Sequence, residues 1–222
     1  MLRVAVLVVC FSIMSGSTQA GAWLREKGTA FTSSSFVTNK RGDGSTMTYL
    51  EYGVLDNLTV GADLMVSYTN TGRQFGFGTL FLRRPIGDAG RNRKFAYQLG
   101  IGAAWDNLLI LPHIEAGLSW GRGLKLGKID GWATIDSSFR WEPTLSRNHL
   151  KVDGTIGLSL GKHTKVMVQM FTENKSGALT STLAPSVLIS PGKGTYTLQV
   201  GVELPDGQND PPRLKLGIWR KF

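Results

Sequence analysis

The sequence has little of three things on which many exported or catalytic proteins depend: cysteine, histidine and long apolar runs. Its single cysteine, Cys10, lies within the first twenty residues, so the chain after them contains no thiol. A small secreted scaffold held together by disulfides is therefore excluded, as is a zinc site with thiolate ligands. The three histidines show no metal-ligand spacing, and no phosphate-binding loop is present. We expect no cofactor and no bound metal.

Helical signals are also missing. No stretch after residue 20 approaches the roughly 20 apolar residues of a transmembrane helix, and no long pattern of period 3.6 appears. Glycine is abundant instead, at 28 of 222 residues, against an average of about 7%. The mean hydropathy is close to neutral, as expected for a barrel whose strands have one apolar and one polar face. These features together favour an all-β protein of the cell envelope.

The first twenty residues have the order of a secretory signal peptide. Arg3 gives a basic start, residues 4–14 form an apolar run, and small and polar residues then lead to Ala20. The apolar run is shorter than the roughly 20 residues that a membrane-spanning helix needs. We expect cleavage between Ala20 and Gly21, which divides the chain into a signal peptide, residues 1–20, and one domain, residues 21–222.

Alternation of apolar and polar residues dominates the rest of the chain. Residues 58–68, 95–105 and 150–160 each alternate over eleven positions, which is typical of strands with one buried face. Segments of about ten residues suit tilted strands that cross a bilayer. Pro112 and Pro185 fall inside segments and are expected to mark bulges or irregular ends. The pattern gives twelve segments, near 28–38, 46–55, 58–68, 74–83, 95–105, 108–120, 128–141, 150–160, 165–173, 182–189, 195–204 and 213–222.

We therefore predict a single closed antiparallel transmembrane β-barrel of about twelve strands, with ten as the alternative count. Two features favour this fold over a soluble barrel. The charges lie on the face opposite the apolar one, and outward aromatic residues gather at segment ends, as in the paired girdles of membrane barrels. These aromatic residues are Tyr68, Trp105 and Trp141 at one rim, and Phe95, Trp120, Tyr196 and Phe222 at the other.

The last segment ends in Phe222, with Leu214, Leu216 and Ile218 at alternating positions before it. This ending resembles the closing strand of bacterial outer-membrane barrels, although Arg220 departs from their commonest aromatic residue. The resemblance implies an integral outer-membrane protein that contacts membrane lipids and is recognised by the barrel-assembly machinery through this strand. The runs at 49–61, 117–123 and 183–187 are similar to an uncharacterised proteobacterial outer-membrane family, for which no substrate is implied.

The charge distribution bears on what the lumen could admit. The formal net charge is +9, yet no basic run interleaved with aromatic residues suggests nucleic-acid binding. The basic excess falls in the predicted periplasmic turns, where it suits contact with anionic headgroups. Arg83 and Arg220 are expected to face outward at that edge. The predicted lumen face is nearly balanced, and its lining candidates are Asp63, His113, Glu115, Asp130, Asp136, Arg140, Lys151, Asp153, Glu203 and Lys215.

Three functions follow from this lumen. The first is a narrow passive channel for small solutes with little charge selectivity, because a plainly basic interior is missing and small residues such as Gly61 and Gly157 leave room. The second is a closed structural or assembly barrel, in which lumen charges pair across strands. The third is a lipid hydrolase, whose serine nucleophile would need His113, His149 or His163 as its base. None of the three lies in a hydrolase motif, and His113 is expected to be a hydrogen-bonded lumen residue, so we expect no enzyme activity. Residues 21–27 are predicted to be too short to fill a bore, and the oligomeric state is left open.

Overall fold

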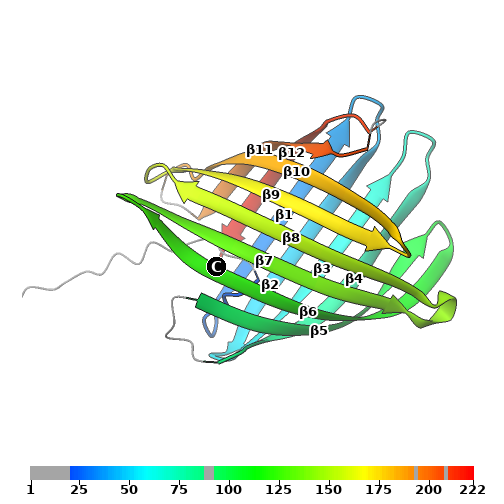
Figure 1. The fold of residues 1–222 in the computed structure, drawn as a ribbon, viewed down its shortest axis with the longest axis horizontal. Helices are drawn as coiled ribbons and strands as arrows, with labels where there is room; N and C mark the ends of the chain where they lie inside the picture. The colour runs from blue at the N-terminus through cyan, green and yellow to red at the C-terminus, as the bar shows by residue number, and fades with distance from the viewer. Residues whose placement is uncertain (1–20, 88–92, 193–194, 208–209) are drawn as a thin grey trace, which may run out of the picture.

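The computed structural model describes residues 21–87, 93–192, 195–207 and 210–222, so the predicted signal peptide lies outside the described residues. Twelve strands form one closed barrel in which each strand pairs with its neighbours along the chain (Figure 1). Over the described ranges, no helix has the length and apolar character needed to cross a membrane. The elements are β1 (Ala30–Asn39), β2 (Gly44–Leu55), β3 (Leu58–Tyr68), β4 (Gln74–Pro85), β5 (Arg93–Asp106), β6 (Leu109–Leu126), β7 (Ile129–Glu142), the short turn η1 (Pro143–Leu145), β8 (Arg147–Ser159), β9 (Thr164–Lys175), β10 (Ala178–Ile189), β11 (Tyr196–Pro205) and β12 (Arg213–Lys221).

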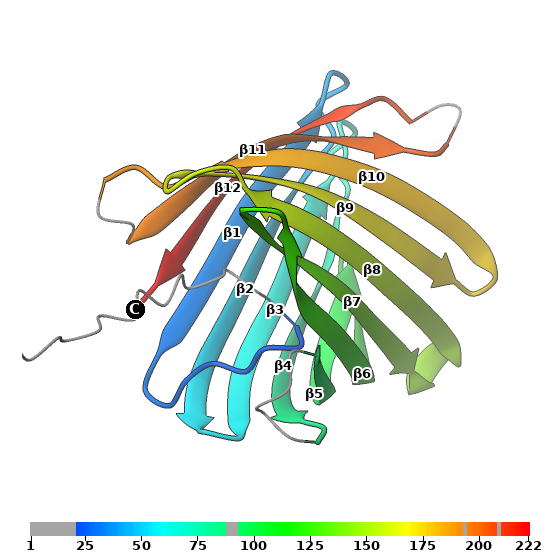
Figure 2. The same ribbon diagram turned by 60° about the vertical axis from the view of Figure 1, so that its left-hand side comes forward.

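The barrel closes between its first and last strands. β12 pairs with β1 in an antiparallel ladder that includes Phe31 opposite Lys221. Beyond that ladder, the Phe222 N–H donates to the Ala30 carbonyl at 3.0 Å, and the Ala30 N–H donates to the Phe222 carbonyl at 3.2 Å. We call the end at which β1 begins and β12 ends the terminal end (Figure 2). Closure gives each described strand a hydrogen-bonded neighbour on both sides, as a barrel surrounded by lipid requires.

The strand count of twelve is confirmed, and residues 58–68 form β3 with the predicted bounds. The two prolines behave differently from expectation, because neither shifts the register. Pro112 pairs with Ala103 of β5 at a level where the β6–β7 ladder has already ended. Pro185 keeps its register with β9, while the β10–β11 ladder skips it and resumes unchanged. Within the described ladders, the register shift lies instead between Gly53 and Leu55, in the β2–β3 pair.

The outer surface is apolar, as a surface in contact with lipid must be. Leu80 and Ile101 face each other across β4 and β5 near the middle of the barrel and are 65% and 67% exposed. In water such a surface would be unstable, whereas hydrocarbon solvates it. The predicted aromatic residues have outward parity and lie at or near strand ends except Trp120, because β6 continues beyond it to Leu126. Arg220 covers the Phe222 ring at 4.4 Å from its centroid. Leu214, Leu216 and Ile218 also point outward and are exposed.

A charge placed at the middle of this outer surface should destabilise the barrel. We expect Leu80→Arg to lower the free energy of unfolding by about 3 kcal/mol, because the guanidinium would lie near the bilayer midplane. Leu108→Arg is the control, since Leu108 is 98% exposed in the β5–β6 turn and lies outside the hydrocarbon. The measurement is urea unfolding in lipid vesicles followed by tryptophan fluorescence. Equal effects of the two substitutions would contradict a lipid-facing position for Leu80.

Candidate functional site

The barrel encloses a central cavity of about 300 Å³. Its wall combines charged and amide side chains with aromatic rings and methionines, so it is neither an apolar core nor a plain aqueous bore. Among the lining residues, four are acidic and three are basic. The ionisable and amide residues that line it are Asp63, Arg83, Gln98, Glu115, Asp136, Lys151, Asp153, Gln169, Gln199 and Lys215; the large apolar or aromatic ones are Phe31, Met47, Tyr49, Trp132, Met167, Phe171 and Trp219.

A continuous polar ladder runs around one wall, and we define it by Glu51, Arg83, Gln98, Glu115 and Arg140. Arg83 forms an ion pair with Glu51, whose side chain is fully buried, and also donates to the Gln98 amide oxygen at 2.6 Å. The Gln98 amide donates in turn to Glu115 at 3.3 Å. Arg140 completes the ladder with two hydrogen bonds to Glu115, at 2.9 and 3.2 Å. Strands β2, β4, β5, β6 and β7 are thereby linked inside the barrel.

The position of Arg83 corrects the sequence prediction. We expected this side chain to face outward at the membrane edge, and the structure instead places it in the lumen, 5% exposed. The reason is the strict alternation of β4, which keeps Thr79, Phe81 and Arg83 on the inner face. Arg84 is the residue that points outward at this level. The sequence prediction assigned Arg83 by its place at the end of the segment, whereas alternation along β4 puts it on the same face as the buried Phe81.

The opposite wall carries separate ion pairs. The Lys151 ammonium is 2.7 Å from the Asp153 carboxylate, and the Lys215 ammonium is 3.1 Å from Glu203. Both ammonium groups also approach the Phe171 ring, at 5.7 and 4.9 Å from its centroid. A cation held between a carboxylate and an aromatic face is stabilised by both, and its charge is largely neutralised.

Small inward residues do not widen the bore as the sequence suggested. A Cβ placed on Gly61 would lie 2.3 Å from the Phe81 ring, and one on Gly157 would lie 2.3 Å from the Trp132 ring. Each glycine therefore makes room for an aromatic side chain on a neighbouring strand. Trp132 then packs with Met167 and Leu188 in a small apolar cluster inside the lumen. The space that these glycines leave is occupied by side chains.

The segment before β1 crosses the lumen at the terminal end, and we call residues 21–27 the strap (Figure 2). On one side it is fixed to β2 and β3: the Arg25 N–H donates to the Thr59 hydroxyl at 2.9 Å, and the Arg25 guanidinium pairs with Glu51 at 2.5 Å. On the other side Trp23 lies against Gly121 of β6, where an added Cβ would be 2.1 Å from its ring. The strap does not fill the bore, but it spans it.

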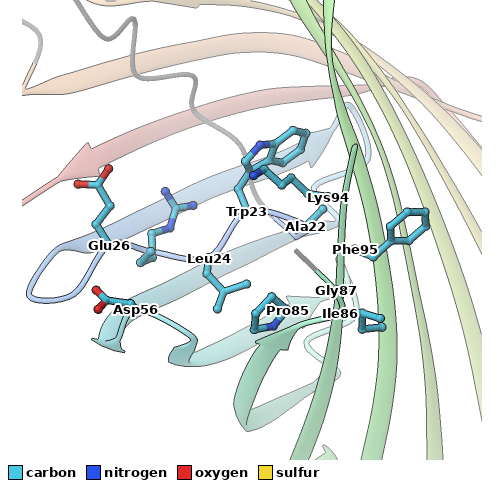
Figure 3. A pocket seen from close by; sticks show the side chains of 11 residues that line it. Ala22, Trp23, Leu24, Glu26, Asp56, Pro85, Ile86, Gly87, Lys94 and Phe95 are labelled. Atoms are coloured by element: carbon cyan, nitrogen blue, oxygen red, sulfur yellow. The ribbon is translucent and has the colours of Figure 1, made fainter. Parts of the chain in front are cut away.

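A second cavity of about 310 Å³ lies between the strap and the barrel rim. Figure 3 shows Leu24 and Trp23 on opposite sides of the strap, with Leu24 pointing toward Pro85 at the end of β4. Ile86 and Phe95 complete the apolar part of this groove. The strap therefore makes apolar as well as polar contacts with the barrel.

The predicted lumen residues fall into three groups. Six of them line the central cavity: Asp63, Glu115, Asp136, Lys151, Asp153 and Lys215. His113, Arg140 and Glu203 face inward but are buried in the wall behind it. Asp130 departs from the prediction, because β6 and β7 project beyond the barrel and its side chain is 65% exposed near Lys125, at 3.9 Å. Alternation gave the correct parity for Asp130, but it does not show where the lumen ends.

His113 was expected to be a hydrogen-bonded residue of the lumen face, and the structure gives it such a bond. The His113 Nε2 atom lies 2.8 Å from the Thr79 hydroxyl, while Glu115 is bound by Arg140 and Gln98. His113 thus reaches across β5 to a threonine on the inner face of β4. The absence of enzyme activity stays a prediction.

A closed barrel of twelve antiparallel strands, apolar outside and charged inside, defines a class of protein: the transmembrane β-barrels of the bacterial outer membrane. No family model and no curated protein matches the chain. Several solved structures match it. A KdgM porin superposes with a TM-score of 0.58 at 9% identity, covering 86% of this chain and 99% of that one.

Two further structures show the same fold. LpxR from Salmonella typhimurium gives a TM-score of 0.57 at 7% identity over 86% of this chain and 99% of that one. An outer membrane channel from Pseudomonas putida F1 gives 0.51 at 12% identity over 91% and 98%. The chain is therefore an integral outer-membrane β-barrel that shares its architecture with porins and channels, and at these identities the likeness extends to the fold alone. Recognition of its last strand by the assembly machinery stays a prediction.

Breaking the polar ladder at its most buried carboxylate should destabilise the barrel. We expect Glu51→Gln to lower the free energy of unfolding by about 3 kcal/mol, because Arg83 and Arg25 would keep their charges without a carboxylate between them. Asp130→Asn is the matched control, since it makes the same chemical change in an exposed pair and should have no measurable effect. Urea unfolding in vesicles measures both, and similar losses in the two variants would refute the role of the ladder.

Proposed function

We propose that the protein is a narrow outer-membrane channel for small solutes, with little selectivity for charge. The observation that carries this proposal is the central cavity, whose wall has four acidic and three basic side chains. Ion pairs among these side chains and their neighbours neutralise much of this charge. A pore that selects strongly for one sign needs a wall with an excess of the other, and this wall has almost none.

The comparison with the KdgM porin sharpens the expected solute class. One structure of that porin is described as a complex with oligogalacturonate, an acidic oligosaccharide. We do not extend this ligand to the present chain, because Lys215, Lys151 and Arg83 each contact a carboxylate already. The aromatic rings beside these pairs favour small solutes that have both polar and apolar surface, such as neutral sugars and other compact polyols.

The strap sets the width of the path at the terminal end. It lies across the lumen between β2–β3 on one side and β6 on the other, so a solute must pass beside Trp23. In barrels of this class the even strand count leaves both chain ends on the periplasmic side. The constriction therefore lies at the periplasmic mouth, and it should exclude all but small solutes.

Conductance of the purified protein in planar bilayers tests the channel. We expect discrete, small openings and a reversal potential close to zero in a salt gradient, because the balanced wall favours neither ion. Vesicles that contain the protein should swell faster in a monosaccharide than in a trisaccharide. A correctly folded, heat-modifiable protein that never conducts at any voltage would exclude the channel and favour a closed structural barrel.

Removing the ring of the strap should widen the path. We expect Trp23→Ala to raise the single-channel conductance severalfold, because the indole that crosses toward Gly121 is lost. Trp141→Ala is the matched control: it removes the same side chain from the outward face of β7 and should leave conductance unchanged. An unchanged conductance in Trp23→Ala would show that the strap is not the constriction.

A further inference from the structure

Gly21, the first residue of the strap, lies directly against a carboxylate inside the barrel. It is buried, has φ of +80°, and a Cβ placed on it would be 1.8 Å from the Asp136 Oδ1 atom. Only glycine suits both this backbone conformation and this contact. Since the backbone nitrogen and a Cβ share the same Cα, the Gly21 nitrogen lies within about 4 Å of that oxygen.

The Asp136 Oδ1 atom, which faces Gly21, lacks a hydrogen-bond partner among the described residues. This atom also has no access to solvent. The neighbour of Asp136 across the β7–β8 ladder is Asp153, a second carboxylate, whose Oδ2 atom pairs with Lys151 while its Oδ1 atom is equally buried and unbonded. Unpartnered buried carboxylate oxygens and facing like charges both destabilise a fold. The structure thus presents an acceptor site that calls for a cation.

We propose that this site binds the α-ammonium group that signal-peptide cleavage creates at Gly21. Hydrolysis of the Ala20–Gly21 peptide bond consumes one water molecule and leaves a carboxylate on Ala20 and an amine on Gly21. The amine is protonated at neutral pH and has three N–H donors where the precursor had one neutral N–H. The ammonium then pairs with Asp136 and reduces the repulsion between Asp136 and Asp153.

The ion pair fixes the free end of the strap. At its other end the strap is already held by the Arg25 contacts with Glu51 and Thr59 and by a bridge between Lys27 and Gly53. Pairing at Gly21 adds an anchor on β7, on the far side of the lumen. The strap is then fastened at both ends, and its position across the bore depends on where the precursor is cut.

The reactivity of the amine tests this pair without any measurement of transport, so failure here is distinct from failure of the proposed channel. The mature protein, purified from outer membranes, is treated with an amine-acetylating reagent, and mass spectrometry follows the N-terminal peptide and the peptide that contains the exposed Lys40. We expect the intact mass to show Gly21 as the first residue. We also expect its amine to react at least tenfold more slowly in the folded protein than after unfolding, while Lys40 reacts at a similar rate in both.

Asp136→Asn should remove this protection and bring the amine close to its unfolded reactivity. Asp130→Asn is the matched control, because it makes the same change on the same strand but at an exposed position, and it should keep the protection. A second variant inserts one serine before Gly21 and verifies the new N-terminus by mass. It leaves Asp136 intact, moves the ammonium by about 3.5 Å, and should also lose protection.

Three results would overturn the proposal. They are a mature N-terminus at another residue, an amine in the folded wild-type protein as reactive as in the unfolded one, and equal protection in Asp136→Asn and the wild type. Heat-modifiability checks that each variant is folded. If Asp136→Asn does not fold, the serine insertion decides: continued protection of its displaced amine would refute the pair.

Discussion

The structure depends on one electrostatic constraint: a charge enclosed by the barrel wall must find an opposite charge within the lumen. Backbone closure pairs each of the twelve strands with two neighbours, so most of the backbone hydrogen-bonding groups of the wall are already used. The inward charges therefore bind one another. Glu51 holds two guanidinium groups, and Glu115 holds Arg140 together with Gln98. These contacts decide which part of the bore stays open.

This constraint explains why the lumen combines ion pairs with aromatic rings. A buried ion pair is stable only when its geometry is good and its remaining hydrogen-bonding groups are satisfied. Tyr49 donates to Glu51 at 2.6 Å and accepts from Arg83 at 2.9 Å, which meets that need on one wall. On the other wall Phe171 lies beneath two ammonium groups. Both sets of contacts hold the lumen side chains in defined positions, which suits the proposed channel with a fixed size limit.

The sequence predicted the architecture well because strand alternation is a local property. A period of two assigns each side chain to the lipid or to the lumen, and it places β3 with its exact ends. The outward prediction for Arg83 is wrong because it rests on the place of this residue at the segment end, and alternation does not show that the Phe81 ring fills the space beside Gly61. Alternation also carries no information on how far the barrel extends along each strand. Asp130 is therefore assigned to the lumen, although it lies where β7 projects beyond the barrel. Strict alternation counted from residue 75 would have placed Arg83 in the lumen. No local pattern predicts that residues 21–27 cross the lumen, because that position depends on contacts with distant strands.

The strap also makes the two mouths of the barrel unequal. In the proposed channel, a solute that enters from the end without the strap would reach the central cavity before the constriction at Trp23, and it could return by the same route. Occupancy of the cavity should therefore follow the concentration on that side, while net passage depends on the rarer step past Trp23. In the proposed channel, the flux would therefore saturate once the central cavity is occupied.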